Sequence, residues 1–157
     1  MDELQKQTNI NIQEKTNLIW DIATHLYGEY KPHEYGKVIL PMTVIKRFDD
    51  CLKSTKKVVV EMTKKLDETG VTGNTKDVIL KKTSGHDFYN CSRFDFETLL
   101  ADPDNLQANF AAYLQGFSDN VKDIISYFEF DKEVSKMSQN DLLYTIIQEF
   151  NSKKEDM

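Results

Sequence analysis

Apolar residues recur at intervals of three and four along nearly the whole chain of 157 residues. This is the period of an α-helix, whereas the strict alternation that marks a half-buried strand is hard to find. The pattern therefore predicts an all-α protein, and we expect a compact multi-helix orthogonal bundle. One apolar run, DVILKK, is too short to settle the period, so residues 76–90 fit either a short helix or one short strand or hairpin.

The length of the chain favours one domain spanning residues 1–157, which can bury roughly two-thirds of the surface exposed by the unfolded chain. Because both ends are polar, we expect residues 1–11 and 152–157 to fray. Two glycines and an asparagine predict a mobile loop at residues 70–75, which divides the domain into two unequal lobes.

The first half of the chain contains two helical patterns. The first runs from about Ile12 to Glu29, with Trp20 interpreted as a core aromatic residue. The second begins near His33 and meets Pro41, which lacks an N–H and is expected to kink the helix or to start a new one.

In the second half, capping residues predict where helices begin. Asp102 and Pro103 form an N-cap and first-turn pair, Ser118 is a cap, and Ser138 with Asp141 resembles a capping box. The apolar residues expected to face inward from these helices are Leu106, Phe110, Tyr113, Leu114, Phe117, Val121, Ile124, Ile125, Phe128, Leu142, Leu143, Ile146, Ile147 and Phe150.

Between these halves, the pattern from Val44 to Leu66 predicts one continuous helix. On such a helix the lysines opposite the apolar face fall within roughly 20° of one line; they are Lys46, Lys53, Lys57 and Lys64. A row of this kind suits either an ordinary solvated face or contact with a phosphate backbone. Arg47 lies near the edge of the apolar face, where it can reach a phosphate or a carboxylate of a partner.

The charge of the chain is unevenly distributed. Residues 31–82 hold 12 Lys and Arg against 7 Asp and Glu, whereas the other residues hold 8 against 19, and the total is -6. A basic central block in an acidic frame can present a local positive surface while other faces contact proteins.

Several functional classes lack their sequence signals. No apolar run exceeds five residues and the start of the chain has no secretory pattern, so we expect a cytoplasmic protein without membrane segments. No GxG occurs, which argues against a dinucleotide fingerprint or a P-loop, and we expect the chain to bind no cofactor. Cys51 and Cys91 have no CxxC partner and are interpreted as reduced thiols.

The titratable residues do not form a catalytic or metal-binding pattern. His25, His33 and His86 lie far apart in the sequence and suit structural or surface roles, so no metal site is expected. The adjacent Asp49 and Asp50 are better interpreted as exposed helix residues than as an acid and base pair.

Four segments of this chain resemble the amino-terminal helical domain of type I restriction-modification methylation subunits. They are LIWDIATHLYGEY, EYGKVILPMTVIKRFDD, FYNCSRFDFETLLADPDNLQANFAAYLQGFSDNVKDII and DLLYTIIQEF. In that family a methyltransferase domain follows, which binds S-adenosylmethionine and methylates adenine with an Asn-Pro-Pro-aromatic loop. The prolines here are Pro32, Pro41 and Pro103, so we expect this chain to lack the catalytic domain and to transfer no methyl group by itself.

The resemblance implies partners: a DNA-specificity subunit, a second methylation subunit and a restriction motor subunit. It predicts a non-catalytic domain that helps to clamp duplex DNA and to dock these subunits. On such a domain the lysine row and the neighbouring arginine are the candidates for phosphate contacts: Lys46, Arg47, Lys53, Lys57 and Lys64. The alternative is an assembly module that binds only proteins, through its acidic later half near Asp119 and Asp123.

Overall fold

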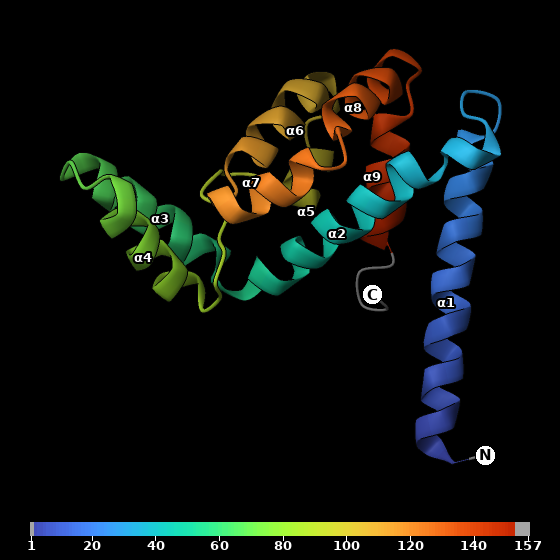
Figure 1. Ribbon diagram of the computed structural model, residues 1–157, viewed down its shortest axis with the longest axis horizontal. Coiled ribbons are helices and arrows are strands. Elements are labelled where there is room, and N and C mark those ends of the chain that lie inside the picture. Colours follow the sequence, from blue (N-terminus) through green and yellow to red (C-terminus); the bar gives the residue numbers. More distant parts are fainter. Residues whose placement is uncertain (1, 153–157) are drawn as a thin grey trace.

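The computed structural model describes residues 2–152, which form α-helices joined by short connections (Figure 1). In chain order the helices are α1 (Glu3–Leu26), α2 (Gly36–Leu52), α3 (Lys56–Glu68), α4 (Gly73–Ser84), α5 (Phe96–Leu100), α6 (Leu106–Gln115), α7 (Asp119–Ser126), α8 (Phe130–Gln139) and α9 (Leu143–Ser152). Short 3-10 turns occur at Pro32–Glu34, Lys53–Thr55 and Pro103–Asn105. Within residues 2–152 β-pairing is limited to isolated bridges, so the all-α prediction is confirmed.

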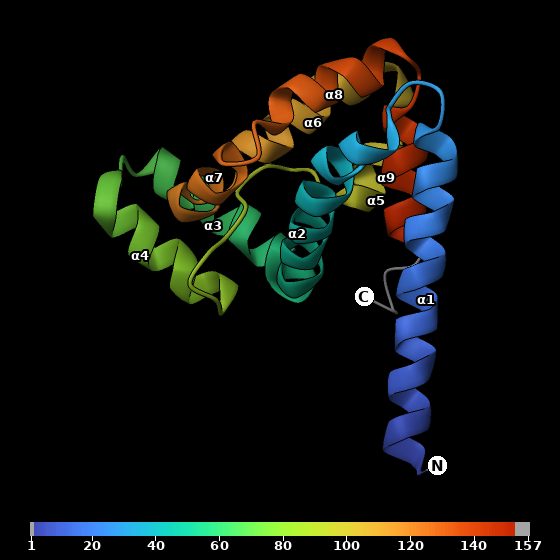
Figure 2. The same ribbon diagram turned by 45° about the vertical axis from the view of Figure 1, so that its right-hand side comes forward.

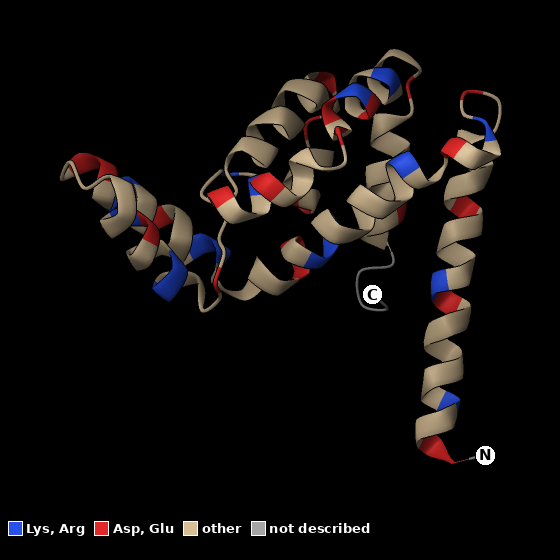
Figure 3. Cartoon of the chain, viewed as in Figure 1, with Lys and Arg blue, Asp and Glu red and all other residues tan. Residues whose placement is uncertain are grey.

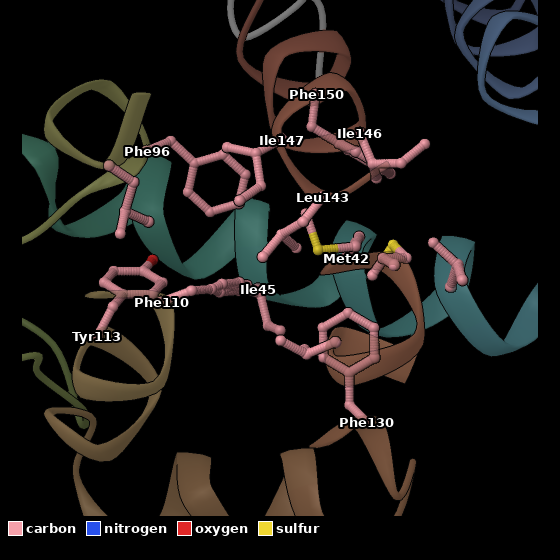
Figure 4. Packing of buried hydrophobic residues seen from close by; sticks show 14 of the residues in the cluster. Met42, Ile45, Phe96, Phe110, Tyr113, Phe130, Leu143, Ile146, Ile147 and Phe150 are labelled. Atoms are coloured by element: carbon pink, nitrogen blue, oxygen red, sulfur yellow. The ribbon is translucent and has the colours of Figure 1, made fainter. Parts of the chain in front are cut away.

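The main bundle is held by one large apolar core between α2, α5, α6, α8 and α9 (Figure 4). Met42 and Ile45 are fully buried and extend from α2 toward aromatic residues of α6 and α8. Phe110 lies at the centre of the aromatic group, with its ring 5.9 Å from Tyr113 and 6.3 Å from Phe130, both edge to face. Such pairs add to the stabilisation that comes from buried apolar area. No helix among the described residues is both long enough and apolar enough to cross a membrane.

Helices α3 and α4 form a separate antiparallel hairpin at one end of the molecule (Figures 1 and 2). Its own small core consists of Val59, Leu66 and Leu80. The structure settles residues 76–90 in favour of helix, because α4 runs to Ser84 and ends at Gly85, whose φ of 79° suits a residue without a Cβ. Of the two alternatives left open by the sequence, the structure thus favours the helix over the strand or hairpin, and α4 already begins inside the predicted loop 70–75.

Helix α1 is longer at its start than the sequence pattern indicated. It begins at Glu3 rather than near Ile12, because Asp2 accepts a hydrogen bond from the backbone N of Gln5 (2.8 Å) and the Gln5 side chain accepts one from the backbone N of Asp2 (3.4 Å). The first half of α1 extends beyond the bundle in both views (Figures 1 and 2). The prediction of a frayed carboxy-terminal end falls on residues 153–157, outside the described residues, while Ser152 belongs to α9.

Two predictions about helix ends need correction. Helix α2 passes through Pro41, which is buried, so the alternative in which Pro41 starts a new helix is wrong. Ser138 lies inside α8, and Asp141 has a φ of 57°, so the predicted capping box does not open α9. The apolar period correctly predicted helices on both sides of Asp141. A residue in the left-handed conformation between two helices, however, gives no periodic signal in the sequence.

The other predicted caps are close to their observed roles. Pro103 opens a 3-10 turn, and α6 begins three residues later. Ser118 is the N-cap residue of α7, although its hydroxyl donates to the side-chain oxygen of Asn120 (2.6 Å) and accepts from the backbone N of Tyr89 (3.2 Å). The predicted inward faces are buried or half-buried, with the exception of Ile124, which is 41% exposed.

Candidate nucleic-acid interface

The α3–α4 hairpin carries most of the exposed positive charge of the basic block. Residues 53–84 contain eight lysines against four acidic residues, and lysines lie along both helices (Figure 3). Two of these lysines are paired: Lys76 with Asp67 at 2.6 Å and Lys81 with Asp77 at 3.1 Å. The lysines that are exposed and form no ion pair within residues 2–152 are Lys53, Lys57, Lys64, Lys65 and Lys82.

The predicted continuous helix from Val44 to Leu66 is wrong. A 3-10 turn at Lys53–Thr55 separates α2 from α3, so the two helices point in different directions and the row of four lysines is broken. On α3 itself, Lys57 and Lys64 are two turns apart, about 10 Å along the axis. They lie opposite the buried Val59 and Leu66 and face solvent.

Lys46 does not belong to an exposed surface. Its side chain is 1% exposed, and its ammonium lies 2.6 Å from Oδ1 of Asp50 and 5.1 Å above the ring of Phe96. A buried ammonium without a carboxylate would be strongly destabilising, and this pairing offsets the cost. The structure therefore contradicts the placement of Lys46 on the solvated lysine row, because periodicity alone cannot identify a cation that is neutralised inside the bundle.

The prediction that Asp49 and Asp50 are exposed helix residues is also wrong. Both are half-buried, and Asp49 accepts a hydrogen bond of 2.8 Å from the hydroxyl of Tyr113. Burial raises the pKa of Asp49, although the Tyr113 hydroxyl and the Lys46 ammonium oppose the rise. Burial also raises the pKa of Tyr113 well above its usual value. These residues connect α2 to α6.

A buried asparagine ties the basic hairpin to the bundle. The ammonium of Lys56, at the start of α3, donates to the side-chain oxygen of Asn90 at 2.8 Å, and the amide of Asn90 donates to the backbone oxygen of Tyr113 at 2.8 Å. Asn90 is only 2% exposed, so these two hydrogen bonds replace the hydrogen bonds to water that its side chain loses on burial. Burial lowers the pKa of Lys56 to about 8, with Asp49 partly opposing this shift.

The same junction depends on a glycine. A Cβ at Gly116 would lie 2.7 Å from the Cβ of Ser92 and 2.8 Å from the side-chain oxygen of Asn90. The close approach lets the backbone N of Cys91 donate to the backbone oxygen of Gly116 at 2.8 Å. The sequence does not reveal this role of Gly116, since a contact between distant segments has no local signal.

The exposed side of α3 includes a cation that sequence reasoning missed. A shallow groove runs between α3 and the segment that follows α4, and both Lys64 and Arg93 line it. The guanidinium of Arg93 lies 4.5 Å from the ring centre of Phe94 and remains exposed. Asp67 and Glu68 line the same groove, so Arg93 adds a cation near Lys64 on a surface that also carries negative charge.

Arg47 lies on a different surface. It is exposed and lines an open groove of about 380 Å³ between α1, α2 and α9. The residues around this groove are Lys15, Leu18, Ile19, Ile22, Ile39, Thr43, Arg47 and Phe150. The bend after α2 thus places Arg47 apart from the lysines of the hairpin.

The histidines and Trp20 lie outside the lysine-rich surface of the hairpin. His25 lies 3.2 Å from a carboxylate oxygen of Glu149, and His86 lies 3.0 Å from the backbone oxygen of Cys51. Among residues 2–152, no three His, Cys, Asp or Glu side chains gather in a way that could hold a metal ion. Trp20 is 68% exposed, so its interpretation as a core aromatic is wrong.

Together the described residues define an all-α domain with a lysine-rich hairpin at one end. The chain belongs to the HsdM N-terminal domain family, whose family model matches residues 15–150. It is thus matched over nearly its whole length to the amino-terminal domain of type I restriction-modification methylation subunits, and the resemblance of the four segments is confirmed. Comparisons with curated proteins and with solved structures found no match.

Proposed function

We propose that this domain helps a type I methylation subunit to hold duplex DNA, through phosphate contacts from the α3–α4 hairpin and its neighbour Arg93. The observation that carries the proposal is a set of exposed cations on one side of α3 that form no ion pair with any residue of the described range 2–152: Lys57 and Lys64, with Lys53 in the preceding turn. Phosphate contacts fix the position of a protein on DNA without reading its sequence. Base recognition would therefore belong to the specificity subunit.

The packing of the hairpin supports this role. A surface that contacts a rigid duplex needs a fixed orientation, and the contact between Lys56 and Asn90 connects α3 to the bundle core. The small hairpin core of Val59, Leu66 and Leu80 keeps α3 and α4 together, while the apolar bundle lies on the other side of the junction. The hairpin can thus reach a ligand that the bundle does not touch.

The test is the salt dependence of DNA binding by the assembled complex of methylation and specificity subunits. If Lys53, Lys57, Lys64 and Arg93 each neutralise one phosphate, changing all four to Gln reduces the slope of log affinity against log salt by about 3.6. The matched control changes the exposed Lys6, Lys37 and Lys132, which lie outside the hairpin, and should leave the slope as it was. An unchanged slope for the fourfold variant contradicts the proposal.

A second candidate function is protein docking by the acidic later half of the chain. Helix α7 exposes Asp119 and Asp123 beside Ile124, and the following Tyr127 is 87% exposed. An exposed aromatic next to apolar and charged residues is typical of a contact centre. Reversing the charges of Asp119 and Asp123 should weaken assembly with the specificity or second methylation subunit, with the helical circular dichroism unchanged. Intact assembly would exclude this surface.

A further inference from the structure

Two chain crossings join the α3–α4 hairpin to the main bundle (Figures 1 and 2). Helix α3 packs extensively against α4 and against the turn at Lys53–Thr55, whereas neither α3 nor α4 packs extensively against a helix of the bundle within residues 2–152. The first crossing is that turn, and the second is the segment between α4 and α5, residues 85–95. The angle between the hairpin and the bundle is therefore set by a few contacts.

Successive side chains of the second crossing alternate between the two regions, as they do along a β-strand. Phe88 faces the bundle, with its ring 4.9 Å from the ring of Phe48 in α2. Asn90 also reaches into the bundle, where its amide donates to the backbone oxygen of Tyr113. Between these two residues, Tyr89 packs instead against the small core of the hairpin.

Tyr89 is held by both regions at once. Its backbone belongs to the bundle, because its oxygen accepts from the backbone N of Ser118 at 2.9 Å and its N donates to the Ser118 hydroxyl at 3.2 Å. Its side chain belongs to the hairpin, because the hydroxyl donates to Oδ1 of Asp77 in α4 at 2.9 Å. Asp77 precedes Ser84, the last residue of α4, by seven residues, which is about 10 Å along the helix axis. Tyr89 thus connects the bundle to the body of the hairpin.

Two other hydrogen bonds of the junction lie at the base of the hairpin. Lys56, the first residue of α3, donates to Asn90, and the hydroxyl of Thr55 donates to the backbone oxygen of Ser84. Contacts at a pivot hold its position but resist tilting only weakly. Lys64 lies eight residues beyond Lys56, about 12 Å along the axis, so a tilt of about 20° displaces it by about 4 Å, more than the length of a hydrogen bond.

We infer that Tyr89 is a positioning residue, which fixes the angle at which the lysine surface of α3 faces its ligand. For DNA this inference rests on the proposed function. Without the ring of Tyr89 the hairpin takes several angles, and only a fraction of them fits a duplex, so the apparent affinity falls by that fraction. The bound complex still neutralises the same number of phosphates, so the dependence on salt stays as it was.

The first test measures the angle of the hairpin in the whole chain without DNA. Spin labels at Glu68→Cys in the hairpin and Gln139→Cys in the bundle, both exposed positions, report one distance in a Cys51→Ser, Cys91→Ser background. We expect a single narrow distance distribution with Tyr89 present and a broad one in Tyr89→Ala. An equally narrow and unshifted distribution in Tyr89→Ala overturns the inference.

Three further variants separate positioning from stability. Tyr89→Phe keeps the ring and should restore the narrow distribution, and Tyr27→Ala, the matched control at a tyrosine that is 79% exposed, should leave it unchanged. Hydrogen exchange in α3 and α4 should rise less in Tyr89→Ala than in Leu80→Ala, which empties the hairpin core itself. Loss of protection as large as in Leu80→Ala would show that Tyr89 only holds the hairpin together, and would overturn the inference.

The second test measures DNA affinity against salt in the assembled complex of methylation and specificity subunits. If about one in five hairpin angles fits the duplex, Tyr89→Ala lowers the affinity about fivefold at every salt concentration and leaves the slope unchanged. Unchanged affinity, or a reduced slope, contradicts positioning by Tyr89. The two proposals fail separately: an unchanged slope in the fourfold Gln variant ends the phosphate-contact proposal, whereas the label distances decide on Tyr89 without DNA.

Discussion

Lysine side chains have opposite environments in the main bundle and in the α3–α4 hairpin. In the bundle, Lys46 is buried, paired with Asp50 at 2.6 Å and placed above the ring of Phe96. In the hairpin, Lys57 and Lys64 are exposed and have no ion pair within residues 2–152. The 3-10 turn at Lys53–Thr55 separates these two environments. The residue type is the same on both sides of the turn, so the packing of the rest of the chain around each helix decides which lysines are exposed to solvent.

The largest expected difference concerns the two apolar cores. Phe110→Ala removes the centre of the bundle's aromatic group and should lower the free energy of unfolding of the whole domain by roughly 3–5 kcal/mol. Leu80→Ala, which empties part of the small core, should instead raise hydrogen exchange in α3 and α4. Urea denaturation and exchange mass spectrometry measure the two effects. If Leu80→Ala lowered the protection against hydrogen exchange equally throughout the chain, the bundle and the α3–α4 hairpin would unfold as one unit.

The next comparison is between the two kinds of lysine. Lys46→Met leaves the half-buried carboxylate of Asp50 without its ammonium partner, and we expect a loss of roughly 1.5–3 kcal/mol in the free energy of unfolding. Lys57→Met changes an exposed side chain and should alter it by less than about 0.5 kcal/mol. Denaturant midpoints distinguish the variants. Similar midpoints for both would mean that the burial of Lys46 is not needed for stability.

The junction between the regions is tested by its glycine. Gly116→Ala forces Ser92 and the side chain of Asn90 to move, and overpacking of this kind costs roughly 1–3 kcal/mol. Gly36→Ala is the matched control, since its Cβ would meet only Leu40 at 3.8 Å. It should be neutral or slightly stabilising in helix α2. Thermal melting compares the two, and equal melting temperatures would contradict the close approach at Gly116.

The smallest effect is the pH dependence that comes from Lys56. Its pKa is about 8 in the folded chain against an ordinary value of 10.5, so between these values the unfolded chain binds more protons. The free energy of unfolding should therefore rise with pH from about 8 to about 9. Closer to pH 10 the tyrosines of the unfolded chain ionise, and the raised pKa of the buried Tyr113 opposes the rise. Lys56→Met should remove this rise. A curve that falls through this range in the wild type and is unchanged in the variant would contradict the burial of Lys56.

The sequence was sufficient for the helical class, the family and the core residues of α6 and α9, because these depend on local period and on ordered segments. It misplaced Lys46 and Trp20, since which side of a helix is covered depends on elements far away in the chain. Asn90, Gly116 and Arg93 were missed for the same reason: each acts through a contact with a distant segment. The turn at Lys53–Thr55 was missed because lysine, serine and threonine do not interrupt a helical pattern as glycine or proline does.

The most direct measurement of the central claim is the acylation rate of each lysine in the assembled complex, with and without duplex DNA, read by mass spectrometry. We predict that DNA slows the reaction at Lys57 and Lys64, leaves the exposed Lys6 and Lys132 unchanged, and finds Lys46 unreactive in both states. Unchanged rates at Lys57 and Lys64 with DNA bound would contradict the account.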